Sequence, residues 1–77
     1  MITVEIESPE TIRVMSHDTW EGAQHYAIRN LHQLDIGNVN AGRRWRDQAT
    51  KAILRTEEDA TVHADKITIQ FMEEDEA

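Results

Sequence analysis

Cysteine is absent from this chain, and its absence removes several kinds of chemistry at once. The chain forms no disulfide, offers no thiolate nucleophile and has no cysteine-based zinc site. A cysteine-free sequence fits a reducing cytoplasm better than secretion. No run approaches the ~20 apolar residues that a membrane span needs, and the first residues carry no basic leader. We therefore expect a cytoplasmic protein without a membrane partner.

Glycine and serine are also scarce, which bears on catalysis. The three glycines, Gly22, Gly37 and Gly42, are too scattered for a phosphate-binding loop. The two serines, Ser8 and Ser16, lie in no nucleophile motif. From this absence of motifs we predict that the chain is not an enzyme and binds no cofactor.

One group of residues has the spacing of metal ligands. Glu21, His25 and His32 fall on one flank of a predicted helix, and a carboxylate four residues from an imidazole can chelate a metal. The group lacks the fixed pair of histidines that makes the HExxH motif specific. We interpret it as a solvated helix flank and predict no metal site.

The remaining composition describes one small domain. Seventy-seven residues, 39% of them hydrophobic and 30% charged, are enough for one core of modest size. A partner or a homodimer would add stability to such a core. We predict a single domain over residues 1–72, followed by an acidic tail over residues 73–77.

Alternating residues predict a β-hairpin at the start of the chain. In the segment MITVEIE, isoleucine and valine alternate with threonine and glutamate, which is the pattern of a half-buried strand. The segment 8–10 contains the only proline and predicts a turn. In the strand after it, Ile12 and Val14 lie on one face and are expected to join the core. Arg13 lies on the other face.

Two helices follow, and each has an apolar stripe. Over residues 17–35 apolar residues recur at three and four positions. Asp18 with Glu21 has the spacing of a capping box, and Ser16 is an alternative start. A second helix is predicted over residues 41–55. The stripes comprise Trp20, Ala23, Ala27, Leu31 and Leu34 in the first helix and Ala41, Trp45, Ala49, Ala52 and Ile53 in the second.

The chain ends in a second β-like region. Ile67, Ile69 and Phe71 alternate with polar residues, whereas Val62 has the opposite parity, which predicts a turn or bulge near residues 64–66. The order is β-β-α-α-β or ββααββ, so we predict an α+β fold with a small antiparallel sheet and two helices packed on one face. The open face of that sheet is expected to carry Thr3, Glu5, Glu7, Arg13, Thr68 and Gln70.

Positive charge is concentrated in the second predicted helix of an otherwise acidic chain. The net charge is −7, yet five of the eight lysines and arginines lie between residues 43 and 55. Basic side chains on one helix can contact phosphates, which gives the hypothesis of a nucleic-acid-binding regulator that uses residues 41–55. The acidic runs after this helix would repel a phosphate backbone, and no RNP, zinc-finger or clear helix-turn-helix pattern is present.

Negative charge favours a different class of function. A small rigid domain with carboxylates on its strands can occupy a basic groove of another protein, and where that groove holds DNA or RNA it acts as a competitive inhibitor. Phages and other mobile elements encode small acidic inhibitors, including anti-CRISPR proteins, and this chain is similar to them in size, charge and lack of enzymatic motifs. We therefore predict a protein-binding module, with nucleic-acid binding as the alternative. The expected contacts are Glu5, Glu7, Glu57, Glu58 and Asp59, with Tyr26, Arg43, Arg44 and Arg46 as secondary contacts.

Tyr26 has two interpretations. It lies one helical turn from Gly22, and an exposed tyrosine beside a position without a side chain resembles a protein-contact patch. Alternatively, Tyr26 folds over the edge of the core. The two interpretations differ in what removal of the ring does to stability.

Overall fold

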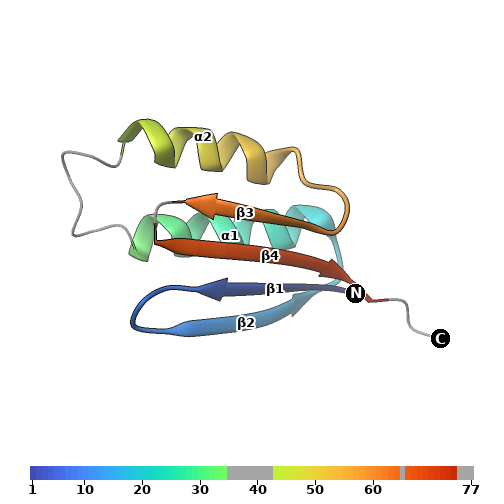
Figure 1. Ribbon diagram of the computed structural model, residues 1–77. Helices are drawn as coiled ribbons and strands as arrows, with labels where there is room; N and C mark the ends of the chain where they lie inside the picture. Colours follow the sequence, from blue (N-terminus) through green and yellow to red (C-terminus); the bar gives the residue numbers. More distant parts are fainter. Residues whose placement is uncertain (35–42, 65, 75–77) are drawn as a thin grey trace.

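The computed structural model describes residues 1–34, 43–64 and 66–74, and the side chains of residues 34 and 43–46 lie outside the described set. Six elements follow one another along the chain in the order ββααββ, which confirms the predicted order (Figure 1). They are β1 (Ile2–Glu7), β2 (Ile12–His17), α1 (Trp20–Leu34), α2 (Arg43–Leu54), β3 (Ala60–Ala64) and β4 (Ile67–Glu73).

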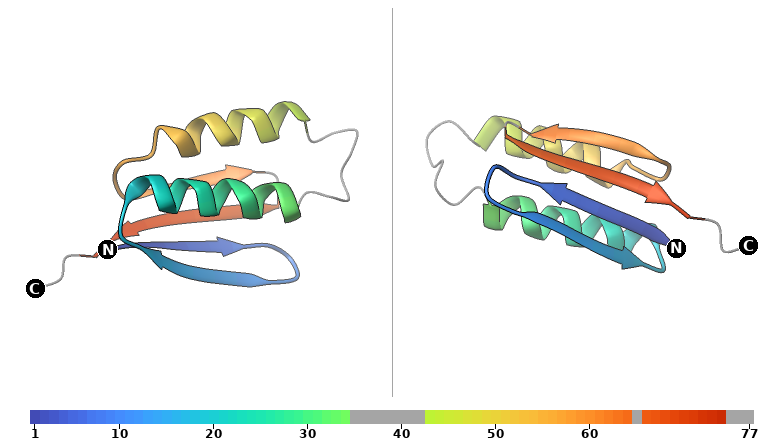
Figure 2. Two further views of the ribbon diagram at one scale, coloured as in Figure 1. Left: turned by 180° about the vertical axis from the view of Figure 1, so that it is seen from behind. Right: turned by 60° about the horizontal axis from the view of Figure 1, so that its bottom comes forward.

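The four strands form one antiparallel sheet in the order β2-β1-β4-β3. The first and last strands of the chain are therefore the two central strands, and β2 and β3 are the edges. Both helices cover the same face of the sheet, and the other face is open (Figure 2). This arrangement confirms the predicted α+β fold class. No helix among the described residues combines the length and the apolar character that crossing a bilayer requires.

The core lies between the two central strands and the helices. Val4 and Ile6 of β1 and Ile69 and Phe71 of β4 are fully buried, because alternate residues of a strand point to the same face. The apolar stripe of α1 meets them through alanines, whose small side chains let the helix lie close to the sheet. The helical members of the core are Ala23, Ala27 and Leu31 from α1 and Ala49 and Ile53 from α2.

The second helix matches its predicted stripe in part. Ala49 and Ile53 are buried as predicted, whereas Ala52 is exposed, so its assignment to the buried arc is wrong. Ala52 lies one position before Ile53, and a helix that centres Ile53 on the sheet turns its neighbour outward. The predicted contacts of Ala41 and Trp45 lie outside the described residues.

The first helix begins one residue later than the sequence predicts. The hydroxyl Oγ1 of Thr19 accepts a hydrogen bond of 3.1 Å from the amide of Gly22, which is the geometry of an N-cap. The predicted capping box of Asp18 and Glu21 is therefore wrong. Adjacent polar residues compete for the cap position, and the packing of Trp20 on the core decides between them.

The turn between β1 and β2 is shorter than the predicted turn over residues 8–10. The amide of Ser8 donates a hydrogen bond of 2.9 Å to the carbonyl of Thr11, which leaves only residues 9–10 at the tip. In the resulting register Ile6 lies opposite Arg13. Because directly opposite residues share a face, the shorter turn reverses the two faces of β2.

This reversal overturns the predicted positions of three residues. Arg13 lies on the helix side of the sheet, where its Nη1 donates hydrogen bonds to Asn30 and Gln33 of α1. Ile12 and Val14 lie on the open face and are 63% and 59% exposed. Arg13 therefore does not belong to the open face, and the two apolar residues do not belong to the core.

The last two strands show the predicted change of parity. β3 ends at Ala64 and β4 begins at Ile67, and the register places Val62 opposite Ile69. Residues of opposite sequence parity therefore share the core face, which confirms the predicted turn near residues 64–66.

We expect the core and the open face to respond differently to truncation. Phe71→Ala removes a fully buried ring and is expected to lower the free energy of unfolding by about 3–5 kcal/mol. Val14→Ala, on the open face, is expected to cost less than about 1 kcal/mol in dilute solution. Urea denaturation of both variants measures the difference. Equal losses would show that Val14 is a core residue, as the sequence alone suggested.

Candidate functional site

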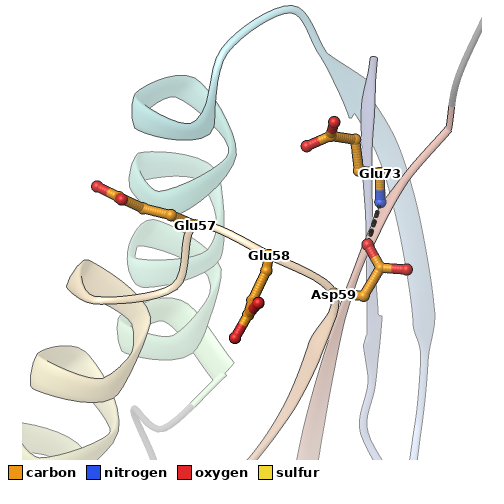
Figure 3. Close-up of a pocket in the computed structure, with 4 residues that line it drawn as sticks. All are labelled: Glu57, Glu58, Asp59 and Glu73. Carbon is orange, nitrogen blue, oxygen red and sulfur yellow. Dashed lines mark hydrogen bonds between the residues drawn. The ribbon is translucent and has the colours of Figure 1, made fainter.

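Four acidic residues lie near one another at one end of the molecule. Glu57, Glu58 and Asp59 form the connection between α2 and β3, and Glu73 is the last residue of β4. Together they line an open hollow of about 400 Å³, which we call the acidic hollow (Figure 3). All four residues are exposed to solvent. The first three were predicted as partner contacts, and the structure brings them together with a fourth.

The connection is held at its two ends by hydrogen bonds. Thr56 is buried, and its carbonyl accepts a 2.7 Å hydrogen bond from Nε2 of Gln24 on α1. At the other end, Oδ1 of Asp59 accepts a 2.7 Å hydrogen bond from the amide of Glu73 (Figure 3). A buried hydrogen bond between two elements resists rearrangement, since opening it leaves both groups unpaired. The carboxylates are therefore attached to a fixed frame.

Trp20 connects the acidic hollow to the core. Its indole Nε1 donates a hydrogen bond of 3.1 Å to Oε2 of Glu73. Its ring packs against Phe71, with the two ring centroids 6.2 Å apart. The side chain of Glu73 is thus positioned by an aromatic pair whose inner member is fully buried.

The electrostatics of the hollow are those of a spread negative patch. Among the described residues, no lysine or arginine forms an ion pair with any of the four carboxylates. The side chains point in different directions instead of converging on one point (Figure 3). In the described part of the chain, no group of three or more histidine or acidic side chains is placed to hold a metal ion. An extended basic surface matches this distribution better than a single cation does.

The other two predicted acidic contacts lie apart from the hollow. Glu5 and Glu7 are on the open face of β1, beside Val14 and Ile12 of β2 respectively. Glu7 lies at the end of the sheet that carries the β1–β2 turn, and the α2–β3 connection lies at the opposite end (Figure 1). The structure therefore divides the predicted acidic contacts between two places.

The basic residues are distributed along α2. Arg43, Arg44 and Arg46 are in its first turn, at the end of the helix away from the acidic hollow, and their side chains lie outside the described residues (Figure 1). Lys51 and Arg55 are exposed near the other end of the helix. The backbone alone thus places the three arginines and the hollow at opposite ends of α2.

Tyr26 lies at the edge of the core. It is half-buried and packs against the hydrophobic core. The centroid of its ring lies 5.0 Å from the centroid of the His17 imidazole. Gly22 lies beside the same imidazole: a Cβ at this position would be in ordinary contact with Nδ1 of His17, at 3.6 Å, and in tighter contact with Oγ1 of Thr19, at 3.3 Å. The role of Tyr26 as a partner contact stays a prediction.

The residues with metal-ligand spacing are exposed on α1. Glu21, His25 and His32 all face solvent, and no described residue from another element completes a set of ligands around them.

Comparison with protein-family models, with curated proteins and with solved structures finds no match to this chain.

Sequence reasoning missed Glu73 and Trp20 as parts of the site. Glu73 was assigned to the acidic tail, although it continues the alternation of Ile67, Ile69 and Phe71 and so has the parity of the core face. That parity was the available signal. The hydrogen bonds of Glu73 to Asp59 and Trp20 join residues distant in sequence, which no local pattern indicates.

We expect the hydrogen bond of Asp59 to contribute to stability through its acceptor atom. Asp59→Ala removes that acceptor and is expected to lower the free energy of unfolding by roughly 1 kcal/mol. This value is smaller than is usual for a hydrogen bond to a charged acceptor, because the site is exposed. Asp59→Asn keeps an acceptor oxygen and should cost less. Chemical denaturation compares the two variants, and equal stability of both would show that the bond contributes nothing.

We expect removal of the Tyr26 ring to destabilise the fold. Tyr26→Ala uncovers His17 and part of the core, so the free energy of unfolding should fall by about 1–3 kcal/mol. Tyr26→Phe keeps the ring and serves as the control. If thermal denaturation shows Tyr26→Ala to be as stable as the unmodified chain, the ring does not pack on the core in solution.

Proposed function

We propose that this chain is a non-enzymatic module whose acidic hollow docks on a basic surface of another protein. The observation that carries the proposal is the gathering of four exposed acidic residues on a fixed frame, with no ion pair to a lysine or arginine among the described side chains. Hydrogen bonds of Trp20, Gln24 and Asp59 hold the frame. An exposed carboxylate that contacts solvent, and no cation of its own chain, is available to a partner's lysines and arginines.

Rigidity is the second support. A binding surface that is already ordered loses little conformational entropy on association, so more of the contact energy appears as affinity. The connection between α2 and β3 is tied to α1 at Thr56 and to β4 at Asp59. The net charge of −7 would also speed the encounter with a basic partner.

The partner class follows from the charge of the hollow. Basic grooves in proteins commonly hold the phosphate backbone of DNA or RNA. A rigid acidic end seated in such a groove would exclude the nucleic acid by competition. We therefore propose a cytoplasmic inhibitor of the kind encoded by phages and other mobile elements, similar in action to anti-CRISPR proteins.

A nucleic-acid-binding regulator remains the competing function. The exposure of Lys51 on α2 and of Arg55 directly after it favours this function, since both side chains are accessible to phosphates. In that case the basic residues of α2, and not the acidic hollow, would contact the ligand. Charge reversal at the two sites has opposite consequences under the two functions.

The first arm of the test uses labelled DNA and RNA. The purified chain is expected to bind neither at low salt, and Arg43→Glu, Arg44→Glu and Arg46→Glu together should change nothing. Binding that weakens steeply with salt and disappears in this triple variant would overturn the inhibitor proposal in favour of the regulator.

The second arm uses a matched pair of charge reversals. The unmodified chain is immobilised to capture its partner from cell lysate, and the captured protein is then titrated with its nucleic acid in the presence of the free chain. Glu57→Lys with Glu58→Lys is expected to lose competition at least tenfold. Glu10→Lys with Asp47→Lys makes the same change of net charge at exposed positions outside the hollow and should retain it. Equal loss in both pairs would mean that net charge, and not the hollow, drives binding.

A further inference from the structure

The free edge strand β2 carries most of the large hydrophobic residues that are exposed in the described part of the chain. Of the five large hydrophobic residues that are exposed, three lie on this strand: Ile12 at 63%, Val14 at 59% and Met15 at 50%. Natural edge strands are usually protected from pairing by lysine, proline or a bulge. The sequence of β2 contains neither of these two residues, and its one arginine, Arg13, is hydrogen-bonded back to α1. β2 therefore carries no lysine, proline or bulge that would block the addition of another strand.

The register shows which backbone groups of β2 face outward. Ser8 and Thr11 form the hydrogen-bonded pair next to the turn. Bonded and non-bonded pairs alternate along an antiparallel ladder. Counting from Ser8 and Thr11, the residues of β2 that do not bond to β1 are Ile12, Val14 and Ser16. Their amide N–H and carbonyl groups point away from β1, toward the free edge.

We propose that β2 pairs antiparallel with β2 of a second copy of this chain, about a two-fold axis at Val14. In this register Val14 faces Val14 of the second copy, and Ile12 faces Ser16. All three residues with outward backbone groups then exchange hydrogen bonds with a partner. If one β2 strand moved by two residues along the other in one direction, Arg13 would face Arg13 of the second copy. If it moved by two residues in the other direction, Ile12 would extend past the end of the second copy's β2 and have no strand residue opposite it. The central register is therefore the best matched one.

The side chains also fit a second copy. On the open face the two Val14 side chains meet at the axis, with Ile12 on either side. On the helix side Met15 lies opposite Arg13 of the second copy, whose aliphatic stem can cover the thioether. Within Ile12–His17 no like charges face each other, whereas beyond the strand ends Glu10 lies on the side of Asp18 of the second copy. Burial of the exposed apolar residues favours association. Because the axis is perpendicular to the sheet, the helices of both copies stay on one face.

The other edge of the sheet is not suited to this pairing. β3 directly follows Glu57, Glu58 and Asp59, so two copies joined there would have an acidic hollow at each end of the shared seam, closer to each other than in pairing through β2. Its exposed side chains, Thr61 and His63, are polar. Pairing through β2 instead places the two hollows at the outer ends of a continuous eight-stranded sheet. This inference is independent of what the hollow binds.

The first test measures mass against concentration. Sedimentation velocity of the unmodified chain is expected to show a monomer that converts to a dimer as concentration rises, and added salt should favour the dimer by screening two chains of −7 each. Val14→Pro removes an outward N–H that β1 does not use, so it should weaken the dimer at least tenfold. Val14→Thr keeps the N–H and is the control. A monomer at every concentration, or a dimer that Val14→Pro leaves intact, would overturn the proposal.

The second test reports the register and does not depend on the folding of the proline variant. The chain has no cysteine, so introduced ones have no background. Val14→Cys should form a disulfide-linked dimer, since directly opposite residues have Cα atoms about 5.5 Å apart, within disulfide range. Ser16→Cys should not, because the two copies of residue 16 would be roughly 14 Å apart along the strands. Equal cross-linking of both variants, or of Ser16→Cys alone, would exclude this register.

Discussion

The pairing of β1 with β4 at the centre of the sheet is the constraint on which the rest of the structure depends. These two strands come from opposite ends of the chain, and they supply the fully buried side chains Val4, Ile6, Ile69 and Phe71. Because they occupy the centre, β2 and β3 are the edges. Both helices pack on the face that carries these buried side chains. The pairing continues past the strands, where the amide of Glu74 donates a 2.8 Å hydrogen bond to the carbonyl of Met1.

This central pair also determines where charge and apolar surface lie. The pairing of β4 with its other neighbour, β3, places the end of β4 beside the start of β3, so that Glu73 joins the three acidic residues of the α2–β3 connection. The central pair leaves β2 at the far edge of the sheet, with Ile12 and Val14 exposed. The two surfaces that we interpret as binding surfaces, the acidic hollow and the edge of β2, are therefore separated by the width of the sheet. One can be occupied without covering the other.

Local patterns in the sequence were enough for the fold but not for every face. The alternation of Ile67, Ile69 and Phe71 and the alanine stripe of α1 are repeated signals, and each repeat strengthens the same conclusion. Which residues of β2 point toward the helices depended on a single residue in the turn. A turn over residues 8–10 and a turn over residues 9–10 differ by one position, and because a strand has a period of two, that one position exchanges its two faces. The hydrogen bond from Ser8 to Thr11 decides between them, and no pattern in the sequence shows it. Likewise, the run of Glu57, Glu58 and Asp59 indicated an acidic site, whereas the part played by Glu73 depends on the pairing of β4 with β3 and on the hydrogen bonds of Glu73 to Asp59 and Trp20.

The most direct test of the acidic hollow as a docking surface is NMR of the isotope-labelled chain during titration with an arginine-rich peptide. The indole N–H of Trp20 donates to Glu73, so its resonance reports on the hollow. We predict that the largest shift changes occur at residues 57–59, at Glu73 and at this indole, and that salt reverses them. Changes confined to Glu5 and Glu7, or spread evenly over all exposed carboxylates, would contradict the account.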